Sequence, residues 1–276
     1  MKYKIVVDSS SNLTSDYIKD DEVGFAVAPL TIRVGGKEYV DNDTVDVDEL
    51  LDNTMKSEEA GKTSCPSPQD FLNTYEDAEH VIVVTISSKL SGSYNSAVLA
   101  KNMSANPDNV HVIDSKLVAG AIRIVANKAY ELIKKGLEYS EICKKLDDYS
   151  KTVNLLFVLD KFDNLVKNGR MNKVLAFVAT MINIKPLCYG EDGEIKIKEK
   201  IRSLQGVFKR LVVNVGKFCE NTKGRICVIS HTNSLENAKI LKALIEQTYE
   251  FDEVIIENNR GLCAFYSLNG GIIVSF

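Results

Sequence analysis

The sequence predicts an α/β fold in two domains, and a pattern of alternating strands and helices carries this prediction. Short apolar runs at 4–7, 81–86 and 110–113 are typical of strands that are buried on both faces of a sheet. Longer amphipathic runs at 94–103 and 117–135 are typical of helices. Because these strands and helices alternate along the chain, we expect an N-terminal domain built on a parallel sheet with helices on both faces.

Capping and turn residues indicate where the elements of this first block begin and end. Residues 67–70 (Ser-Pro-Gln-Asp) predict a helix start, with serine as the N-cap and proline in the first turn. Gly136 predicts the end of one helix, and Ser140 predicts the N-cap of the next. The pair at 35–36 (Gly-Gly) separates two short runs rich in β-formers and therefore predicts a hairpin.

A second block starts near residue 151, where hairpins and helices mix. Its predicted strands lie at 155–159, 184–189, 194–198, 226–230, 253–257 and 271–276, and its predicted helices lie at 173–181, 203–220 and 235–248. A shorter helix ends at Gly169, and the turn at 190–193 predicts a second hairpin, so we expect a mixed sheet in a C-terminal α/β domain. The predicted domains are 1–150 and 151–276. Their boundary is soft and allows segments to cross it, since no linker rich in proline or serine separates them.

Composition excludes several classes of protein. The chain has 276 residues and a net charge of −4, so no bulk attraction to nucleic acid or to an anionic membrane is expected. No apolar run approaches the roughly 18 residues of a membrane-spanning helix, and the first run meets Asp8 too early for a signal peptide. None of the six cysteines forms a C-x-x-C pair, and the three histidines lack ligand spacing. We therefore expect free thiols, no metal site and a cytoplasmic location.

The charge is unevenly distributed between the two predicted domains. Residues 1–150 hold 16 basic and 25 acidic side chains, a net of −9, whereas residues 151–276 hold 18 basic and 13 acidic side chains, a net of +5. Opposite charges facing each other across a cleft would help to hold it closed, within the limits of salt screening.

Three hydroxyl-rich clusters, at 8–12, 63–67 and 87–94, are candidate ligand sites. We expect them at strand ends or before helices, which is where open α/β sheets bind ligands. Hydroxyls and the free N–H groups of a helix N-terminus suit a carboxylate or a phosphate. Each cluster has a simpler interpretation as a helix cap. Gly92 favours the ligand interpretation for the third cluster, because it lets the backbone approach a ligand closely.

Familiar catalytic motifs are incomplete. The segment at 61–63 (Gly-Lys-Thr) resembles the end of a phosphate loop, but Lys56 stands where the first glycine of that motif is required. There is no G-x-S-x-G elbow, and no histidine sits in a motif that makes it a base for Ser91 or Ser93. A serine-dependent acyl or phosphate-ester hydrolase remains an alternative, since a sequence leaves spatial neighbours open.

A series of ordered motifs, almost from end to end, resembles the DegV family, the acyl-binding component of bacterial fatty acid kinase systems. The motifs are Ile5-Val6-Val7-Asp8-Ser9-Ser10 with Asn12-Leu13, Pro29-Leu30-Thr31, Thr63-Ser64-Cys65-Pro66-Ser67-Pro68, Ser87-Ser88-Lys89-Leu90-Ser91-Gly92-Ser93-Tyr94, Asp114-Ser115, Asn168-Gly169-Arg170 and Asn183-Ile184-Lys185-Pro186. The resemblance implies two α/β domains with a long-chain fatty acid, such as palmitate, stearate or oleate, held between them. It also implies a non-enzymatic lipid-binding protein that presents its ligand to a separate fatty acid kinase subunit, with no cofactor.

The resemblance also implies which residues bind the carboxylate. Thr63 and Ser91 are the first expected ligands, with Ser64, Gly92 and Ser93 close by. Neutral hydroxyls and backbone N–H groups suit one negative charge shared by two acceptor oxygens. The tail requires an apolar tunnel. The candidates, for each of which plain core is the more common interpretation, are Leu90, Phe157, Leu165, Phe177, Ile182, Ile184 and Phe265.

One segment departs from the family pattern. The family usually carries a histidine before a Gly-Pro-Gly stretch near its C-terminus, and here Tyr266 stands at that position with no proline after it. A tyrosine hydroxyl donates one hydrogen bond but lacks a titratable imidazole. A regulatory or interaction protein with a vestigial pocket is therefore a further alternative. Arg170 and Arg202 are possible further site residues, associated in the family with kinase contact or phosphate handling; Arg170 also reads as a solvated residue after a helix stop.

Overall fold

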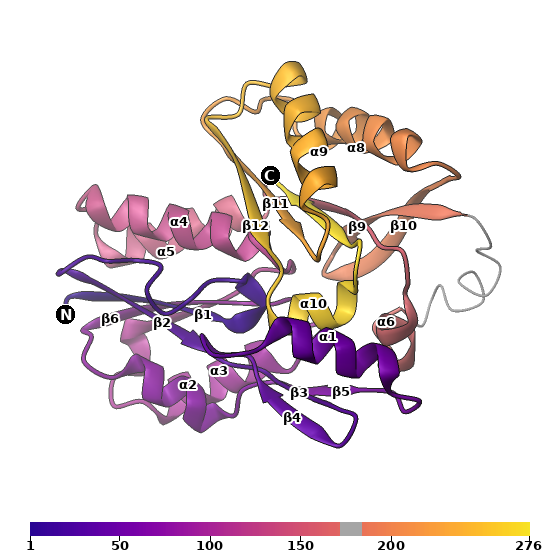
Figure 1. Cartoon of the computed structure of the whole chain (residues 1–276). Coiled ribbons are helices and arrows are strands. Elements are labelled where there is room, and N and C mark those ends of the chain that lie inside the picture. The colour runs from indigo at the N-terminus through magenta and orange to yellow at the C-terminus, as the bar shows by residue number, and fades with distance from the viewer. Residues whose placement is uncertain (172–183) are drawn as a thin grey trace.

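The computed structural model describes residues 1–171 and 184–276, which form three sheets and the helices that cover them (Figure 1). The first sheet has the order β2-β1-β6-β7 and is parallel throughout. Its strands are β1 (Tyr3–Asp8), β2 (Val23–Ala28), β6 (His80–Thr85) and β7 (Val110–Asp114). The parallel sheet that the sequence predicts is therefore confirmed.

Helices cover both faces of this sheet, because its strands are apolar on both sides. Val6 and Val83 point toward α2 (Pro68–Tyr75) and α3 (Ser93–Met103), where they join a core with Phe71. Alternate strand residues such as Ile5 and Ile82 point the other way and share a core with α4 (Gly120–Lys134) and α5 (Tyr139–Ser150). Figure 1 shows the two helix pairs on opposite sides of the strands.

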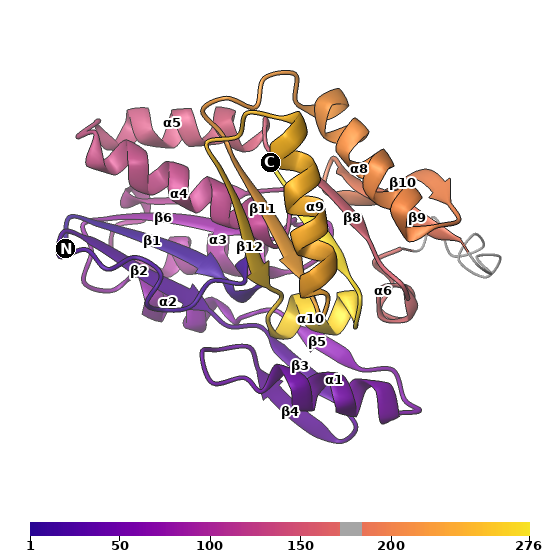
Figure 2. The ribbon, with the colours of Figure 1, turned by 45° about the horizontal axis from the view of Figure 1, so that its top comes forward.

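The second sheet is mixed, as predicted, and has the order β10-β9-β8-β13-β11-β12. Only β11 and β12 pair in parallel among its described strands. The strands are β8 (Leu155–Val158), β9 (Lys185–Glu191), β10 (Glu194–Ile201), β11 (Ile226–His231), β12 (Glu253–Asn258) and β13 (Ile272–Ser275). One face packs under α8 (Leu204–Phe218) and α9 (Leu235–Thr248), and the other face, which carries Leu155 and Phe157, turns toward the first half of the chain (Figure 2).

A small antiparallel sheet, β4-β3-β5, lies at one edge of the molecule beside α10 and α1 (Figure 2). It consists of β3 (Thr31–Val34), β4 (Lys37–Val40) and β5 (Lys62–Ser64). The hairpin predicted at 35–36 joins β3 to β4, and both glycines there have positive φ. Around this sheet lie α1 (Val47–Lys56), α6 (Asp163–Lys167), α10 (Gly261–Ser267) and the 3-10 turn η1 (Ser9–Ser11), while the 3-10 turn η2 (Pro107–Asn109) precedes β7.

The two halves of the chain share one core. Helix α4 lies between the first and second sheets, and it starts at Gly120, where a Cβ would lie 2.5 Å from a methyl carbon of Val228 on β11. Only glycine allows this close approach. Helix α10 comes from the C-terminal half and packs against α1, β3 and η1 of the N-terminal half. Segments therefore contact both halves, and the domain division at residue 150 stays a prediction.

Several element boundaries differ from the prediction. Helix α4 starts at Gly120 and not at 117, because Lys116 and Ala119 both have positive φ in the turn before it. Ser140 does not cap α5, which starts at Tyr139 after Glu138 and has no side-chain cap. Ser67 does cap α2 and forms a capping box with Asp70. The elements that the sequence did not predict are β2, α1, β5 and α10, and the helix predicted at 173–181 lies outside the described residues.

Candidate functional site

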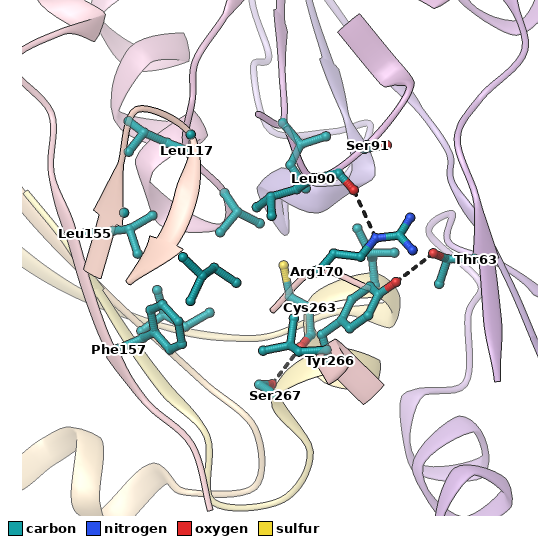
Figure 3. A pocket seen from close by; sticks show the side chains of 18 of the residues that line it. Thr63, Leu90, Ser91, Leu117, Leu155, Phe157, Arg170, Cys263, Tyr266 and Ser267 are labelled. Atoms are coloured by element: carbon teal, nitrogen blue, oxygen red, sulfur yellow. Dashed lines mark hydrogen bonds between the residues drawn. The ribbon is translucent and has the colours of Figure 1, made fainter. Parts of the chain in front are cut away.

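A cavity of about 290 Å³ lies between the two halves of the chain (Figure 3). Segments far apart in the sequence line it: β5, the loops after β6 and β7, the inner face of the second sheet, and α10. Its polar and charged lining residues are Thr63, Ser64, Cys65, Ser91, Lys116, Arg170, Glu194, Cys263, Tyr266 and Ser267. The remaining lining residues are aliphatic, aromatic or glycine. The cavity thus combines an extended apolar surface with a few polar groups, which is typical of a small-molecule site.

One end of the cavity gathers hydroxyl groups around an arginine. Thr63 Oγ1 lies 2.8 Å from the Tyr266 hydroxyl, and either of the two is able to donate the hydrogen bond. Arg170 Nε donates to the carbonyl oxygen of Leu90 at 3.1 Å, which holds the guanidinium beside the Ser91 loop. Figure 3 shows Arg170, Tyr266 and Thr63 together at this end. The geometry provides hydrogen-bond donors and one positive charge for an anionic head group.

The Tyr266 hydroxyl stays protonated at neutral pH. Burial raises the pKa of Tyr266 above its usual value, and this effect exceeds the opposite effects of the Thr63 hydrogen bond and the Arg170 charge. A protonated phenol is a neutral donor. Tyr266 therefore offers hydrogen bonding to an anion without adding negative charge to the site.

The loop after β6 brings Ser91 to the cavity and Ser93 directly behind it. Ser91 Oγ lies 3.0 Å from Ser93 Oγ and also accepts from the Ser93 backbone N–H at 3.3 Å. Gly92 lies between them and contacts the β5–α2 loop so closely that a Cβ would sit 2.9 Å from Cys65 Sγ. Glycine at this position therefore lets the two serine- and threonine-bearing loops meet at one end of the cavity.

A buried carboxyl supports this loop from behind. Asp8, at the end of β1, accepts from the Ile86 N–H at 2.8 Å and from the Ser10 N–H and hydroxyl at 3.1 and 2.5 Å. Burial raises the pKa of Asp8 to about 6, although hydrogen bonds from Ser10, Ile86 and Ser93 act in the opposite direction. The residue thus fixes the start of the loop that carries the serines.

The rest of the cavity is mainly apolar and comes from the sheets, although Lys116 and Glu194 also line it beside the hairpin turn. Phe157, Leu155 and Ile273 point inward from the inner face of the second sheet, opposite Leu90 and Leu117 of the first half. Figure 3 shows Leu117, Leu155 and Phe157 on the side away from Thr63 and Arg170. The cavity is therefore polarised: the hydroxyls and Arg170 lie at one end, and aliphatic side chains dominate the other end, where Lys116 and Glu194 are the charged lining residues.

The structure brings most of the expected head-group residues together. Thr63, Ser64, Ser91, Gly92, Arg170 and Tyr266 all line the cavity, and Ser93 lies one hydrogen bond behind Ser91. Arg202 does not: it follows β10 and is exposed, so a role in kinase contact stays a prediction.

The candidate tunnel residues divide into three groups. Leu90, Phe157 and Leu165 line the cavity. Phe265 is fully buried core that packs against Gly61, and Ile184 is likewise absent from the cavity wall, so the tunnel prediction is corrected at both positions. Phe177 and Ile182 lie outside the described residues.

Several lining residues were not predicted from the sequence, among them one group on α10 and one on the second hairpin. Cys263, Tyr266 and Ser267 stand at positions i, i+3 and i+4 of the short helix α10, so all three lie on one side of it. Recognition of a helix at 261–267 would have found them through this spacing. Gly190 and Ile195, which face each other across the second hairpin, are the other group.

The described residues also bear on histidine chemistry, on metal binding and on membrane spanning. None of the three histidines lines the cavity: His80 stacks on Tyr139, His111 binds Asp147, and His231 lies at a separate hollow beside α9. In residues 1–171 and 184–276 no cluster of three or more histidine, cysteine or acidic side chains is placed to bind a metal. None of the helices in these two ranges is long and apolar enough to span a membrane.

Comparison with known proteins identifies the family. A family model described as "Uncharacterised protein, DegV family" matches residues 2–272. The chain belongs to the DegV family. This DegV protein is 35% identical to a DegV domain-containing protein of Streptococcus pyogenes serotype M1, with 100% of the chain and 99% of the relative covered. The resemblance found in the motifs is therefore confirmed.

Solved structures of related proteins match this DegV protein over nearly their whole length. The fatty acid kinase (Fak) B3 protein of Streptococcus pneumoniae, loaded with linoleic acid, is 33% identical with a TM-score of 0.93, covering 100% of this chain and 99% of that one. A DegV family protein of Ruminococcus gnavus with vaccenic acid is 32% identical with a TM-score of 0.92, at the same coverage. A third, from Eubacterium eligens and loaded with heptadecanoic acid, is 28% identical with a TM-score of 0.90, covering 99% and 98%.

Proposed function

We propose that this protein binds a long-chain fatty acid, such as palmitate, stearate or oleate, as a lipid carrier and not as an enzyme. The observation that carries the proposal is the polarised cavity: a cluster of donors around Thr63 and Arg170 lies at one end, and the remaining wall is mainly apolar. Structures of relatives at 28–33% identity that hold vaccenic, linoleic or heptadecanoic acid support it.

The carboxylate binds at the polar end. Thr63, Tyr266 and Ser91 supply hydroxyls, and Arg170 supplies a positive charge, so each carboxylate oxygen finds a donor. Ser64, Gly92 and Ser93 complete the loops that hold these groups. Most of the donors are neutral, so binding does not require several charged side chains to be removed from water along with the carboxylate. The ligand therefore remains exchangeable.

The tail supplies most of the affinity. About 15 methylenes buried at roughly 0.8 kcal/mol each give a gross gain of order 12 kcal/mol, from which the costs of ordering and association are subtracted. Head-group contacts therefore set the orientation of the ligand more than its affinity.

The bound carboxylate is presented to a separate fatty acid kinase subunit. Ser64 and Gly92 are exposed although both line the cavity, so the polar end reaches the protein surface where a second protein gains access. The name of the Fak B3 relative supports a kinase partner, and Arg202 is a candidate contact. A bacterial cytoplasmic location, with no cofactor and no membrane insertion, fits such a role.

Two alternatives are less well supported. A serine hydrolase requires a base for Ser91 or Ser93, and all three histidines of the chain lie away from the cavity in the described structure. A vestigial pocket predicts a filled tunnel, whereas an open cavity of about 290 Å³ is present.

Native mass spectrometry of purified and then delipidated protein tests the proposal. We expect a co-purified acyl chain in the first sample and rebinding of added oleate in the second. Thr63→Val is expected to weaken binding by about 1.5–3 kcal/mol through loss of one charge-assisted bond. Thr31→Val, on the strand that pairs with β5 and outside the cavity, is the matched control with unchanged affinity. Absence of any acyl chain in both samples would refute the proposal.

A further inference from the structure

The end of the cavity away from Thr63 and Arg170 is built by the β9–β10 hairpin. Gly190 of β9 pairs with Ile195 of β10 in the antiparallel register, and both line the cavity. A Cβ on Gly190 would lie 3.7 Å from Leu155 Cγ and 4.0 Å from Leu117 Cδ2. Figure 3 shows these two leucines on the side away from Thr63 and Arg170. Gly190 thus stands at the end that an acyl tail reaches last.

Neither the backbone conformation nor close packing requires a glycine at position 190. Its φ is not in the left-handed region, and a Cβ there would meet its neighbours only at ordinary van der Waals distances. Gly193 in the same hairpin is different, since its φ is +81° and a Cβ would lie 2.5 Å from Ser87 Oγ. Gly193 is needed for the turn and its docking, whereas the missing side chain of Gly190 leaves space in the cavity.

The hairpin holds this end wall in a fixed place. Ser87 Oγ donates to the carbonyl oxygen of Gly193 at 2.8 Å, and Lys116 Nζ lies 3.7 Å from Asp192 Oδ1. These contacts dock the hairpin turn onto loops of the first half of the chain. The distance between the donor end and the hairpin end is therefore set by the fold.

We propose that the Gly190–Ile195 pair sets the longest acyl chain that the cavity accepts, an inference that rests on the proposed function. A side chain at Gly190 would occupy the space of the last carbons of the tail, and a smaller side chain at Ile195 would extend that space. Each methylene that is excluded from or added to the cavity changes relative affinity about fourfold.

Competition among fatty acids of different length tests this proposal. Delipidated protein is incubated with an equimolar mixture of saturated acids of roughly twelve to twenty carbons, and the bound acids are measured by native mass spectrometry. Gly190→Val is expected to lower the preferred length by about two carbons, which reduces the share of the longest acid roughly 16-fold relative to wild type. Ile195→Ala is expected to raise the preferred length.

Ile197→Ala is the matched control. Ile197 is half-buried on the same strand and the same face as Ile195 but does not line the cavity, so its truncation should leave the length preference unchanged. A Gly190→Val protein with the wild-type preference for chain length overturns the proposal. If Gly190→Val binds no acid, an unchanged length preference in Ile195→Ala overturns it instead. If the wild-type protein binds no acid at all, the proposed function fails instead.

Discussion

The two ends of the cavity are built by different means. The donor end consists of short loops and a helix of seven residues, and its groups are held by side-chain hydrogen bonds such as that between Thr63 and Tyr266. The apolar end consists of a sheet face and a docked hairpin, and its residues are held by backbone pairing and packing. Binding at the donor end therefore depends on individual polar groups, whereas strand pairing and hairpin docking position the residues that limit capacity at the apolar end, Gly190 and Ile195.

Removal of the charge at the donor end should weaken binding more than any other single change. Arg170→Gln should weaken oleate binding by about 2–5 kcal/mol, because the ligand carboxylate loses its cationic partner inside a partly buried site. Isothermal titration calorimetry measures the change. Arg202→Gln, which removes an exposed arginine outside the cavity, serves as the control and should leave the affinity unchanged. Equal affinities of the two variants would show that the donor end needs no charge.

Asp41 supports α10, the helix that carries Tyr266, and it should make the free energy of unfolding depend on pH. Asp41 accepts a hydrogen bond from the Leu262 N–H at 2.9 Å and is fully buried. Burial raises the pKa of Asp41 to about 6, and the nearby charge of Asp8 adds to this rise. The Leu262 hydrogen bond, the Ser9 hydroxyl and the Arg260 charge act in the opposite direction. A carboxyl with a raised folded pKa gives stability that is present below pH about 4 and lost as the pH rises through about 6, by up to roughly 3 kcal/mol.

Asp41→Asn should remove the share of this pH dependence that Asp41 contributes, whereas Asp8, whose pKa burial also raises to about 6, keeps its own share. The amide keeps an acceptor for the Leu262 N–H and does not ionise, so the variant should gain stability relative to wild type between pH about 4 and 7. Urea unfolding at several pH values gives the free energy of unfolding of both proteins, and the difference between them is followed as a slope against pH. A constant effect of the substitution on stability does not change this slope. Parallel stability curves for the two proteins would contradict the assignment of Asp41.

The most modest change concerns the residue that departs from the family pattern. Tyr266→Phe should weaken oleate binding by about 0.5–1.5 kcal/mol, since one neutral hydroxyl is lost and Thr63 keeps its own. Tyr266→His should recover much of that loss, with a pH dependence that the wild-type protein lacks. Fluorescence competition against a labelled acid measures both variants, and a Tyr266→Phe protein with wild-type affinity would place the hydroxyl outside the head-group site.

The difference between the two ends also explains which site residues a sequence reveals. Hydroxyl motifs at 63–67 and 87–94 carry their chemistry in adjacent residues, so the sequence points to these clusters, and the resemblance to the DegV family selects Thr63 and Ser91 within them. Gly190 and Ile195 enter the cavity through strand pairing and hairpin docking, which leave no local pattern. Phe265 was a candidate for the tunnel and is buried in the core. The sequence does not separate the two places, because an apolar residue looks the same in a core and in a cavity wall.

Some elements of the fold were predictable from the sequence and others were not, as for the site residues. Long periodic segments such as the helix at 235–248 were predicted at their observed bounds, because their apolar residues repeat at helical spacing. Helix α10 was missed because seven residues that begin with glycine and are buried on nearly all sides show no such repeat. Strand β5, only three residues long, is a strand through its pairing with β3.

A crystal structure with a fatty acid that carries bromine on its last carbon would test the polarity of the cavity at both ends at once. The anomalous signal of bromine locates the tail, and the electron density locates the carboxylate. We expect bromine beside Leu117, Leu155 and Ile195, with the carboxylate within hydrogen-bond distance of Thr63 and Arg170. Bromine beside Thr63, or a ligand bound outside the cavity, would contradict this polarity.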